Sequence, residues 1–317
     1  MISLSELSSK LKQEKSVALF CHIRPDGDTL GSALALSYAL KNLGIRAQVF
    51  CDDIVPARFF FLHAVKDVKR ELDGDYSAFI AIDCADSTRL GGFYDTFIKH
   101  KNTYSIDHHV SNTRYAKINY VFDNSSNCEN VLGLIELLGA NVDKDIATFL
   151  AMGIMTDTGN FKHKNVTSNT LFSAGKMVEK GADLNFIHYH MFTKQSKQRA
   201  KLFGQIMSKI RYFLCDKFAV ATIRQKDLLD TNARPEETEG FIDFVMGIDT
   251  VEVGACVLEL ENNKFKISFR SKGADVNAVA GTFGGGGHVL ASGCQISGEY
   301  EDVVDKITFA VSRYIEE

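Results

Sequence analysis

Short apolar runs alternate with helix-like patterns through the first half of the chain, and this alternation constrains the fold more than any other feature. The runs at 16–21, 47–51, 78–82 and 103–106 are rich in apolar and β-branched residues, typical of strands buried on both faces. Helical patterns cover 30–43, 129–138, 145–155 and 168–180. Strands that alternate with helices predict a parallel sheet wrapped by helices. We therefore predict an α/β fold.

The second half of the chain has a different pattern. Residues 195–210 are predicted to form a polar helix, after which strand-like segments dominate. The predicted strands are 218–223, 251–260 and 264–270, with helices at 236–246 and 302–314. We expect a first domain over 1–190, a linker helix over 191–210 and a smaller α/β domain over 211–317.

Carboxylates and imidazoles directly follow three of the predicted strands. His22 follows the first strand, Asp83 the third and Asp107 the fourth. In open α/β sheets, ligands bind at the carboxyl ends of the strands, which lie along one crevice. A carboxylate after an apolar run is costly to bury unless it is paired, hydrogen-bonded or bound to a metal. These positions therefore indicate a site that collects cations.

Each cluster also has a plain structural alternative. Asp26 and Asp28 flank Gly27 in a turn-forming segment, where an aspartate could simply cap the following helix. Asp83 could cap a helix or pair with Arg89. Asp157 ends an apolar helix, where a negative charge opposes the helix dipole and requires a compensating cation.

Two adjacent histidines, His108 and His109, extend the fourth strand. Adjacent residues in a strand point to opposite sides. We therefore expect only one of them to share an ion with Asp83, while the other faces the substrate.

The charges suggest how many ions the site holds. The aspartates at 26, 28, 83 and 157 balance two divalent cations, and His22 and His108 complete the ligand set. Two ions about 3.5–4 Å apart activate a hydroxide and neutralise phosphoryl oxygens. Mixed imidazole and carboxylate ligands favour Mn²⁺, with Mg²⁺, Co²⁺ or Fe²⁺ as alternatives. The sequence thus predicts a two-metal phosphoesterase.

Composition narrows the class of protein. The seven cysteines are scattered without a C-x-x-C pair, which argues against a disulfide framework or a zinc ribbon and for a reducing cytoplasm. No apolar run approaches the about 20 residues of a membrane span. The net charge of −4 offers no positive field for a long polyanion, so short nucleic acids are the expected substrates.

Several motifs together resemble those of the DHH phosphoesterases. They are H-x-x-P-D-x-D-x-x-G-S over 22–32, D-C-A-D from Asp83, D-H-H from Asp107 and T-D-T-G-x-F over 156–161. In the second half, F-R-S-K-G-A-D-V-N over 269–277 and G-G-G-G-H-V-L-A-S-G over 284–293 resemble the DHH-associated type 1 (DHHA1) domain. The layout is similar to the nano-RNase and pAp-phosphatase branch. These oligoribonucleases degrade very short RNA and 3′-phosphoadenosine 5′-phosphate (pAp).

The resemblance implies roles for individual residues. One ion would be held by His22, Asp26 and Asp83, and the other by Asp28, Asp83, His108 and Asp157, with Asp83 bridging. His109 would contact the scissile phosphate or assist the leaving group. The active site would lie in the cleft between the two domains, and the substrates would be short RNA, dinucleotides such as pApA, and pAp.

The glycine run of the second domain has two interpretations. Four glycines before His288 could form a hinge or a turn. Bare backbone amides can also approach a phosphate closely. By resemblance we predict that Gly285, Gly286, Gly287, His288 and Arg270 bind the part of the substrate away from the scissile bond. An arginine at 270 could bind a phosphate with two parallel hydrogen bonds, as lysine could not.

Two departures from the family pattern bear on substrate preference. Asn127 stands where relatives often have Ser or Thr, and Arg24 fills a variable position before Pro25. The alternatives are a single-strand exonuclease on longer DNA or RNA, an inorganic pyrophosphatase or exopolyphosphatase, and a nucleotide sensor without catalysis. The sequence leaves open the physiological substrate among pApA, pGpG, nanoRNA and pAp, the cleavage polarity, the resident metal and the oligomeric state, a homodimer included.

Overall fold

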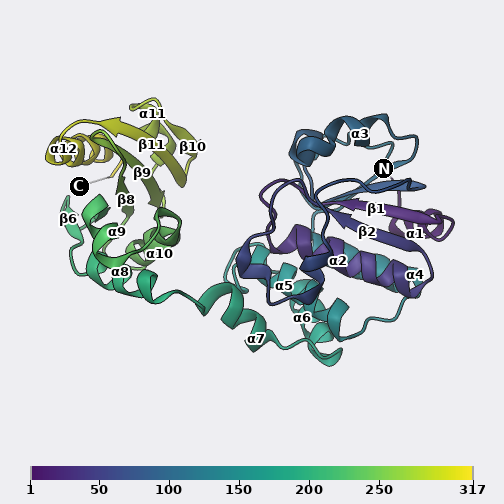
Figure 1. The fold of residues 1–317 in the computed structure, drawn as a ribbon. Helices are drawn as coiled ribbons and strands as arrows, with labels where there is room; N and C mark the ends of the chain where they lie inside the picture. The colour runs from purple at the N-terminus through teal and green to yellow at the C-terminus, as the bar shows by residue number, and fades with distance from the viewer. Residues whose placement is uncertain (1, 316–317) are drawn as a thin grey trace. The chain divides into compact units, whose positions relative to one another are not determined.

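The computed structural model describes residues 2–315, and the chain divides into two compact units (Figure 1). The first runs to Lys194 and the second starts at Gln195. Within the described residues, no helix combines the length and apolar character needed to cross a bilayer. Each unit has its own sheet and hydrophobic core, so the two are described separately.

The first unit is built on a parallel sheet, as predicted. Five strands lie in the order β2-β1-β3-β4-β5, and every neighbouring pair is parallel. Their bounds are β1 Ser16–Phe20, β2 Arg46–Phe50, β3 Ala78–Ile82, β4 Thr103–Asp107 and β5 Ile118–Val121. The order reverses between β1 and β3, and ligands bind at such a reversal in open α/β sheets. The fold therefore places a crevice where His22 and Asp83 follow their strands.

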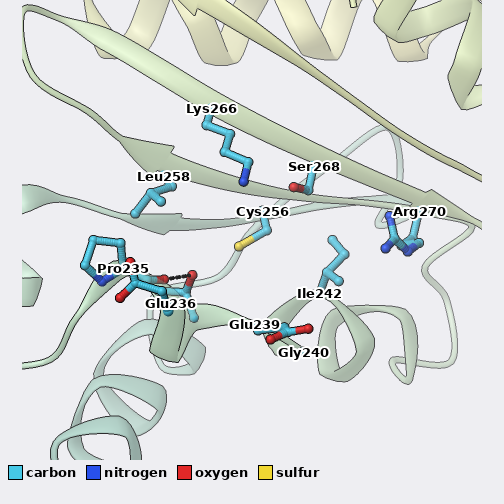
Figure 2. Close-up of a pocket in the computed structure, with 11 residues that line it drawn as sticks. Pro235, Glu236, Glu239, Gly240, Ile242, Cys256, Leu258, Lys266, Ser268 and Arg270 are labelled. Atoms are coloured by element: carbon cyan, nitrogen blue, oxygen red, sulfur yellow. Dashed lines mark hydrogen bonds between the residues drawn. The ribbon is translucent and has the colours of Figure 1, made fainter. Parts of the chain in front are cut away.

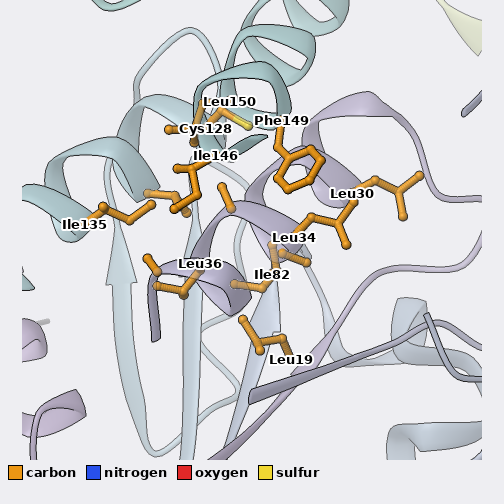
Figure 3. Packing of buried hydrophobic residues seen from close by; sticks show 14 of the residues in the cluster. Leu19, Leu30, Leu34, Leu36, Ile82, Cys128, Ile135, Ile146, Phe149 and Leu150 are labelled. Carbon is orange, nitrogen blue, oxygen red and sulfur yellow. The ribbon is translucent and has the colours of Figure 1, made fainter. Parts of the chain in front are cut away.

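Helices cover both faces of this sheet (Figure 1). One face packs against α2, α4 and α5, and Figure 3 shows the leucine, isoleucine and phenylalanine side chains that fill this core. The other face buries an aromatic cluster around Phe20, Phe79 and Phe97 beneath α3. The helices are α1 Leu4–Leu11, α2 Gly27–Asn42, α3 Tyr94–Lys99, α4 Asn127–Leu138, α5 Lys144–Asp157, α6 Ser168–Glu179 and α7 Leu184–His188.

Glycines allow α2 and α5 to pack unusually closely. A β-carbon at Gly31 would stand 2.4 Å from the Phe149 carbonyl oxygen, and one at Gly27 would stand 2.3 Å from Thr156 Oγ1. Real β-carbons do not approach other atoms so closely. The contact lays the first turn of α2 beside the last turn of α5, which brings Asp28 near Asp157.

The second unit holds a six-stranded sheet in the order β10-β11-β9-β8-β7-β6. Only β7 and β8 are parallel neighbours, so the sheet is mixed. The strands are β6 Arg211–Phe213, β7 Phe218–Ile223, β8 Val253–Glu259, β9 Lys264–Ser271, β10 Gly286–His288 and β11 Ala291–Ser297. Helices α11 (Val276–Gly281) and α12 (Tyr300–Val311) cover one face, and α8 (Lys197–Met207), α9 (Gln225–Thr231) and α10 (Phe241–Met246) pack on the other.

Two details of this unit differ from the sequence expectation. Helix α8 lies within the range expected for a linker, but it buries Leu202 and Ile206 in the core beside β7, so it is part of the second unit. The helix expected over 236–246 is broken into a 3₁₀ turn, Pro235–Thr238, and α10. Gly240 separates them with a φ of 82°, a left-handed conformation that a continuous helix excludes.

Candidate metal centre

Side chains from distant parts of the sequence meet at the carboxyl ends of β1, β3 and β4. His22 Nε2 lies 3.4 Å from Asp26 Oδ2 and 3.7 Å from Asp83 Oδ2. The three ligand atoms of this group lie within 4.8 Å of one another. This spacing is that of donors around a single cation.

A second group forms on the opposite side of Asp83. His108 Nε2 lies 3.8 Å from Asp28 Oδ2 and 3.7 Å from Asp157 Oδ2. It also lies 3.4 Å from Asp83 Oδ1. Asp83 thus presents one oxygen to each group, which is the geometry required of a carboxylate that bridges two ions.

The electrostatics of the centre fit two cations. Asp83 Oδ1 is buried and has no hydrogen-bond partner among the described residues. Burial and the neighbouring carboxylates raise the pKa of Asp83 well above its usual range, and burial with the charge of Asp157 raises the pKa of Asp28 to about 7. Burial also raises the pKa of Asp157. Crowded carboxylates hold protons when nothing else neutralises them, and bound cations would replace those protons.

The backbone directs two imidazoles toward these carboxylates. His22 Nδ1 lies 2.8 Å from the Ile23 carbonyl oxygen, and His108 Nδ1 lies 3.0 Å from that of Asn124. A carbonyl can only accept, so the bond to Asn124 places the proton of His108 on Nδ1 and leaves its Nε2 lone pair for a metal. At His22 the carbonyl alone does not decide the tautomer, because a second group also faces Nδ1. Arg89, considered above as a partner of Asp83, instead has its Nη2 3.0 Å from His22 Nδ1.

Asp26 serves as a helix cap and faces the centre at the same time. Its Oδ1 accepts the backbone N–H groups of Asp28 and Thr29, at 3.1 and 3.0 Å, and so caps α2. Its Oδ2 faces His22. Burial raises the pKa of Asp26, but the hydrogen bonds from His22 and the backbone outweigh burial and lower it to about 2. The cap and a ligand role are therefore compatible.

Backbone amides of another helix hold Asp28. The N–H groups of Asn127 and Cys128 donate to Asp28 Oδ2 and Oδ1, at 2.5 and 2.9 Å. These are the first two residues of α4, whose N-cap residue Ser126 makes no side-chain capping bond. The positive end of a helix stabilises a carboxylate. Nothing in the sequence around Asp28 indicated this support.

Asp83 itself adopts a left-handed conformation, with a φ of 56°. Few residues other than glycine adopt this region, and aspartate is among those that tolerate it. The backbone N–H of Asp83 still donates to the Ile106 carbonyl at 2.9 Å, so the turn begins at the sheet edge. This turn places the side chain between the two groups.

His109 is oriented by Asp107, a residue whose own role the sequence did not show. Asp107 is fully buried; its Oδ1 accepts from His109 Nδ1 at 2.8 Å and from the His108 backbone N–H at 2.9 Å. Its Oδ2 accepts from Asn112 Nδ2 at 2.6 Å. The hydrogen bond to Asp107 raises the pKa of His109, although burial opposes the shift. A third of the His109 side chain is exposed, so its other nitrogen can reach a ligand.

Both histidines approach the same oxygen of Asp83, so they do not point to opposite sides as adjacent residues of a strand would. His108 Nε2 lies 3.4 Å and His109 Nδ1 3.6 Å from Asp83 Oδ1. Strand β4 ends at Asp107, so the alternation of a strand no longer governs the next two residues. The two histidines differ in their hydrogen bonds: His109 Nδ1 is already bound to Asp107, whereas His108 Nε2 faces the carboxylates.

Arg270, in the second unit, lines a pocket of about 460 Å³ (Figure 2). One wall is a row of alternate β9 side chains: Lys266, Ser268 and Arg270. Cys256, Leu258 and Ile242 add apolar surface, and Glu236 and Glu239 add carboxylates. The pocket therefore combines cations, an apolar surface and hydrogen-bond acceptors.

The glycine run forms a tight hairpin next to Arg270. Gly286, Gly287 and His288 form β10, in which His288 lies opposite Ala291, and Ala291 lies opposite Arg270. Residues paired in this way share a face of the sheet, so His288 and Arg270 point to the same side. A β-carbon at Gly285 would stand 2.2 Å from the Gly293 carbonyl oxygen, and Gly287 has a φ of 154°. Close packing therefore requires these two glycines, whatever they bind. Asp275 caps α11.

Comparison with known proteins gives matches to both units. The DHH family, N-terminal domain, matches residues 16–154, and the DHHA1 domain matches residues 216–317. The bifunctional oligoribonuclease and PAP phosphatase NrnA of Thermus thermophilus is 29% identical over 312 residues, covering 95% of this chain and 91% of the relative. The protein of the same name from Bacillus subtilis is 24% identical over 297 residues, covering 92% and 93%.

A solved structure shares the fold. An exopolyphosphatase-related protein from Bacteroides fragilis has a TM-score of 0.85 at 23% identity, covering 98% of this chain and 96% of that protein. DHH phosphoesterases depend on divalent metal ions, and the acidic and histidine groups described above could bind them. The two domain matches, in this order along the chain, identify the protein as a DHH-family phosphoesterase that carries a DHHA1 domain.

Proposed function

We propose that this protein hydrolyses short oligoribonucleotides, including dinucleotides such as pApA, and removes a phosphate from pAp, using two divalent cations. The observation that carries the proposal is Asp83, whose two oxygens face two separate groups of ligands. The NrnA relatives, named for these two activities, align over nearly their whole length. For the resident ion we propose Mn²⁺, which suits carboxylate ligands, with Mg²⁺, Co²⁺ or Fe²⁺ as alternatives.

The residues divide the work as follows. His22, Asp26 and Asp83 would hold one ion, and Asp28, Asp83, His108 and Asp157 the other. Two such ions supply a hydroxide at neutral pH and neutralise phosphoryl oxygens. His109, whose pKa is raised by its bond to Asp107, would donate a proton to the leaving oxygen. Such assistance is worth about 10²–10⁴ in rate.

The second unit would bind the nucleotide away from the scissile bond. Arg270 has no carboxylate partner among the described residues. Its Nη1 donates to the Phe269 carbonyl oxygen, which leaves the other N–H groups of the guanidinium for a phosphate. His288 shares the face of the sheet, and the backbone of Gly285, Gly286 and Gly287 runs beside it. Apolar surface from Cys256 and Ile242 suits the face of a base. We assign substrate binding to residues 211–317 and metal-dependent catalysis to residues 1–190.

The compartment follows from the cysteines. All seven are free in the structure, and all but Cys215 are buried. Free thiols of this number persist in a reducing environment. We therefore place the enzyme in the cytoplasm.

A comparison of substrates tests the function. With Mn²⁺, we expect turnover of pAp and pApA and little turnover of pyrophosphate or of a decamer. Asp83→Ala should abolish hydrolysis and the binding of both ions together, because both groups lose their shared carboxylate. Binding of two ions by this variant, or faster turnover of pyrophosphate than of pApA by the unsubstituted enzyme, would refute the proposal.

A further inference from the structure

Asn127 is a buried polar side chain that lacks hydrogen-bond partners. It is the first residue of α4 and is 0% exposed, and neither Nδ2 nor Oδ1 has a partner within the described residues. Asn130, one turn further along the helix, provides a contrast. Its Nδ2 donates to the Asp107 and Phe122 carbonyls, and its Oδ1 accepts from Asn124. Of these two asparagines on one helix, Asn130 thus has hydrogen-bond partners for its amide and Asn127 has none within the described residues.

An unsatisfied amide of this kind needs an explanation. A buried amide gives up its hydrogen bonds to water, and nearly all such groups in folded proteins regain them from protein, ordered water or a ligand. The unpaired amide of Asn127 therefore points to a partner that is not part of the polypeptide.

The position of Asn127 identifies that partner. Its backbone N–H lies 2.5 Å from Asp28 Oδ2, an oxygen that is itself 3.8 Å from His108 Nε2. Residues three apart share a helix face. Asn130 on this face contacts the end of β4 at the Asp107 carbonyl, directly before His108. Asn127 therefore lies beside the group formed by Asp28, His108 and Asp157.

We propose that the Asn127 amide binds an oxygen held by the cation at this group. Such an oxygen would come from a water molecule in the substrate-free enzyme and from the phosphoryl group of a bound substrate. Nδ2 can donate to a phosphoryl oxygen, and Oδ1 can accept from a metal-bound water. Asn127 would then position the water or the phosphoryl group at the metal centre. This inference rests on the two-metal hydrolysis proposed above.

Replacing the amide by an apolar group of similar size tests the role. Isothermal titration of Asn127→Leu with Mn²⁺ is expected to show weaker binding of one of the two ions, by about tenfold or more, as for other groups that hydrogen-bond around a metal site. Inorganic phosphate should bind the Mn²⁺-loaded variant correspondingly less well. In EDTA the melting temperature should stay level or rise, because the substitution removes an unpaired buried amide.

Ser37→Ala is the matched control. Ser37 lies on α2 of the same unit, is 1% exposed and has an Oγ without a partner among the described residues, but it is nine residues from Asp28. Its removal should leave both Mn²⁺ and phosphate affinity unchanged. Asn127→Ser, which demands less room, is measured in parallel, so that a Leu variant that fails to fold does not end the test.

The outcomes separate this inference from the proposed function. If the unsubstituted enzyme binds two Mn²⁺ ions and hydrolyses pAp, but both variants bind Mn²⁺ and phosphate as it does, the role of Asn127 is refuted and the function stands. If the unsubstituted enzyme binds no Mn²⁺, the proposed function itself fails. Selective loss of one ion's affinity, with the EDTA melting temperature preserved, supports the role.

Discussion

Gly153 leaves the space that Asp28 occupies. A β-carbon at this position of α5 would stand 2.8 Å from Asp28 Oδ1 and 2.2 Å from Cys128 Sγ. Gly153→Ala is therefore expected to push Asp28 out of place without removing any ligand. A displacement near 1 Å in an active site lowers turnover by about 10²-fold. Mn²⁺ titration and kcat on pAp would show the loss.

Gly175→Ala serves as the control for that substitution. Gly175 lies in α6, and a β-carbon there would meet nothing within 4 Å. Alanine in a helix interior is favoured over glycine by about 0.5–1 kcal/mol. The control should be slightly more stable and fully active. Equal activity of the two variants would contradict the account of Gly153.

The pH dependence of stability should differ between metal-free and metal-loaded enzyme. The pKa of Asp28 is raised to about 7 in the folded chain, so the folded state holds a proton that the unfolded state loses from about pH 4 upward. This contribution to stability is present at low pH and is lost as the pH rises through about 7. In EDTA the melting temperature should therefore fall between about pH 4 and about pH 7.

Mn²⁺ should reverse that trend, because the cations replace the protons. Metal affinity is then expected to rise with pH over the same interval, with protons released on binding. Calorimetric titrations in two buffers of different ionisation enthalpy would count these protons. Metal binding that is independent of pH would show that the carboxylates are already ionised.

Asp107→Asn should separate the orientation of His109 from metal binding. The substitution removes the charge that raises the pKa of His109 but keeps an oxygen that can accept a hydrogen bond. We expect the pKa of His109 to fall, and kcat to fall by about 10²-fold at neutral pH with little change in Mn²⁺ affinity. The alkaline limb of the pH–rate profile should shift to lower pH. An unchanged profile would exclude His109 as the proton donor.

Arg270→Lys should affect substrate affinity rather than chemistry. Lysine keeps the charge but cannot form two parallel hydrogen bonds to a phosphate. We expect KM for pApA to rise by about tenfold, the loss expected for one charged hydrogen bond, while Mn²⁺ binding is unchanged. Lys226→Arg, an exchange on α9 outside the pocket, provides a comparison. A fall in Mn²⁺ affinity alone would show that Arg270 has been assigned to the wrong ligand.

The sequence predicted the features that depend on local pattern. The strands before His22, Asp83 and Asp107 were recognised as apolar runs, and the crevice followed from the parallel order they imply. Strand β5 was missed because its four residues are only partly buried and follow no clear alternation. Local pattern thus located the donors of the centre better than it located the edge of the sheet.

Contacts between elements distant in the sequence could not be predicted. The α4 amides bind Asp28 across about a hundred residues, |i−j| being 99 and 100 for the two bonds. The clearance at Gly153 depends on how α2 and α5 cross, and the hydrogen bond between Asp107 and His109 depends on where β4 ends. Each of these contacts depends on how distant elements pack, so it cannot be predicted from a short stretch of sequence.

The hydrogen bonds from the α4 amides to Asp28 also affect how the enzyme acquires its ions. Main-chain amides hold Asp28, and a main-chain carbonyl holds His108, without assistance from a metal. An arriving cation therefore finds these two ligands already in place. Loading then needs little refolding, and ions can be exchanged in the native state. Which ion occupies the site is then expected to depend on two factors: the supply of each divalent ion in the cell and the relative affinity of the site for it.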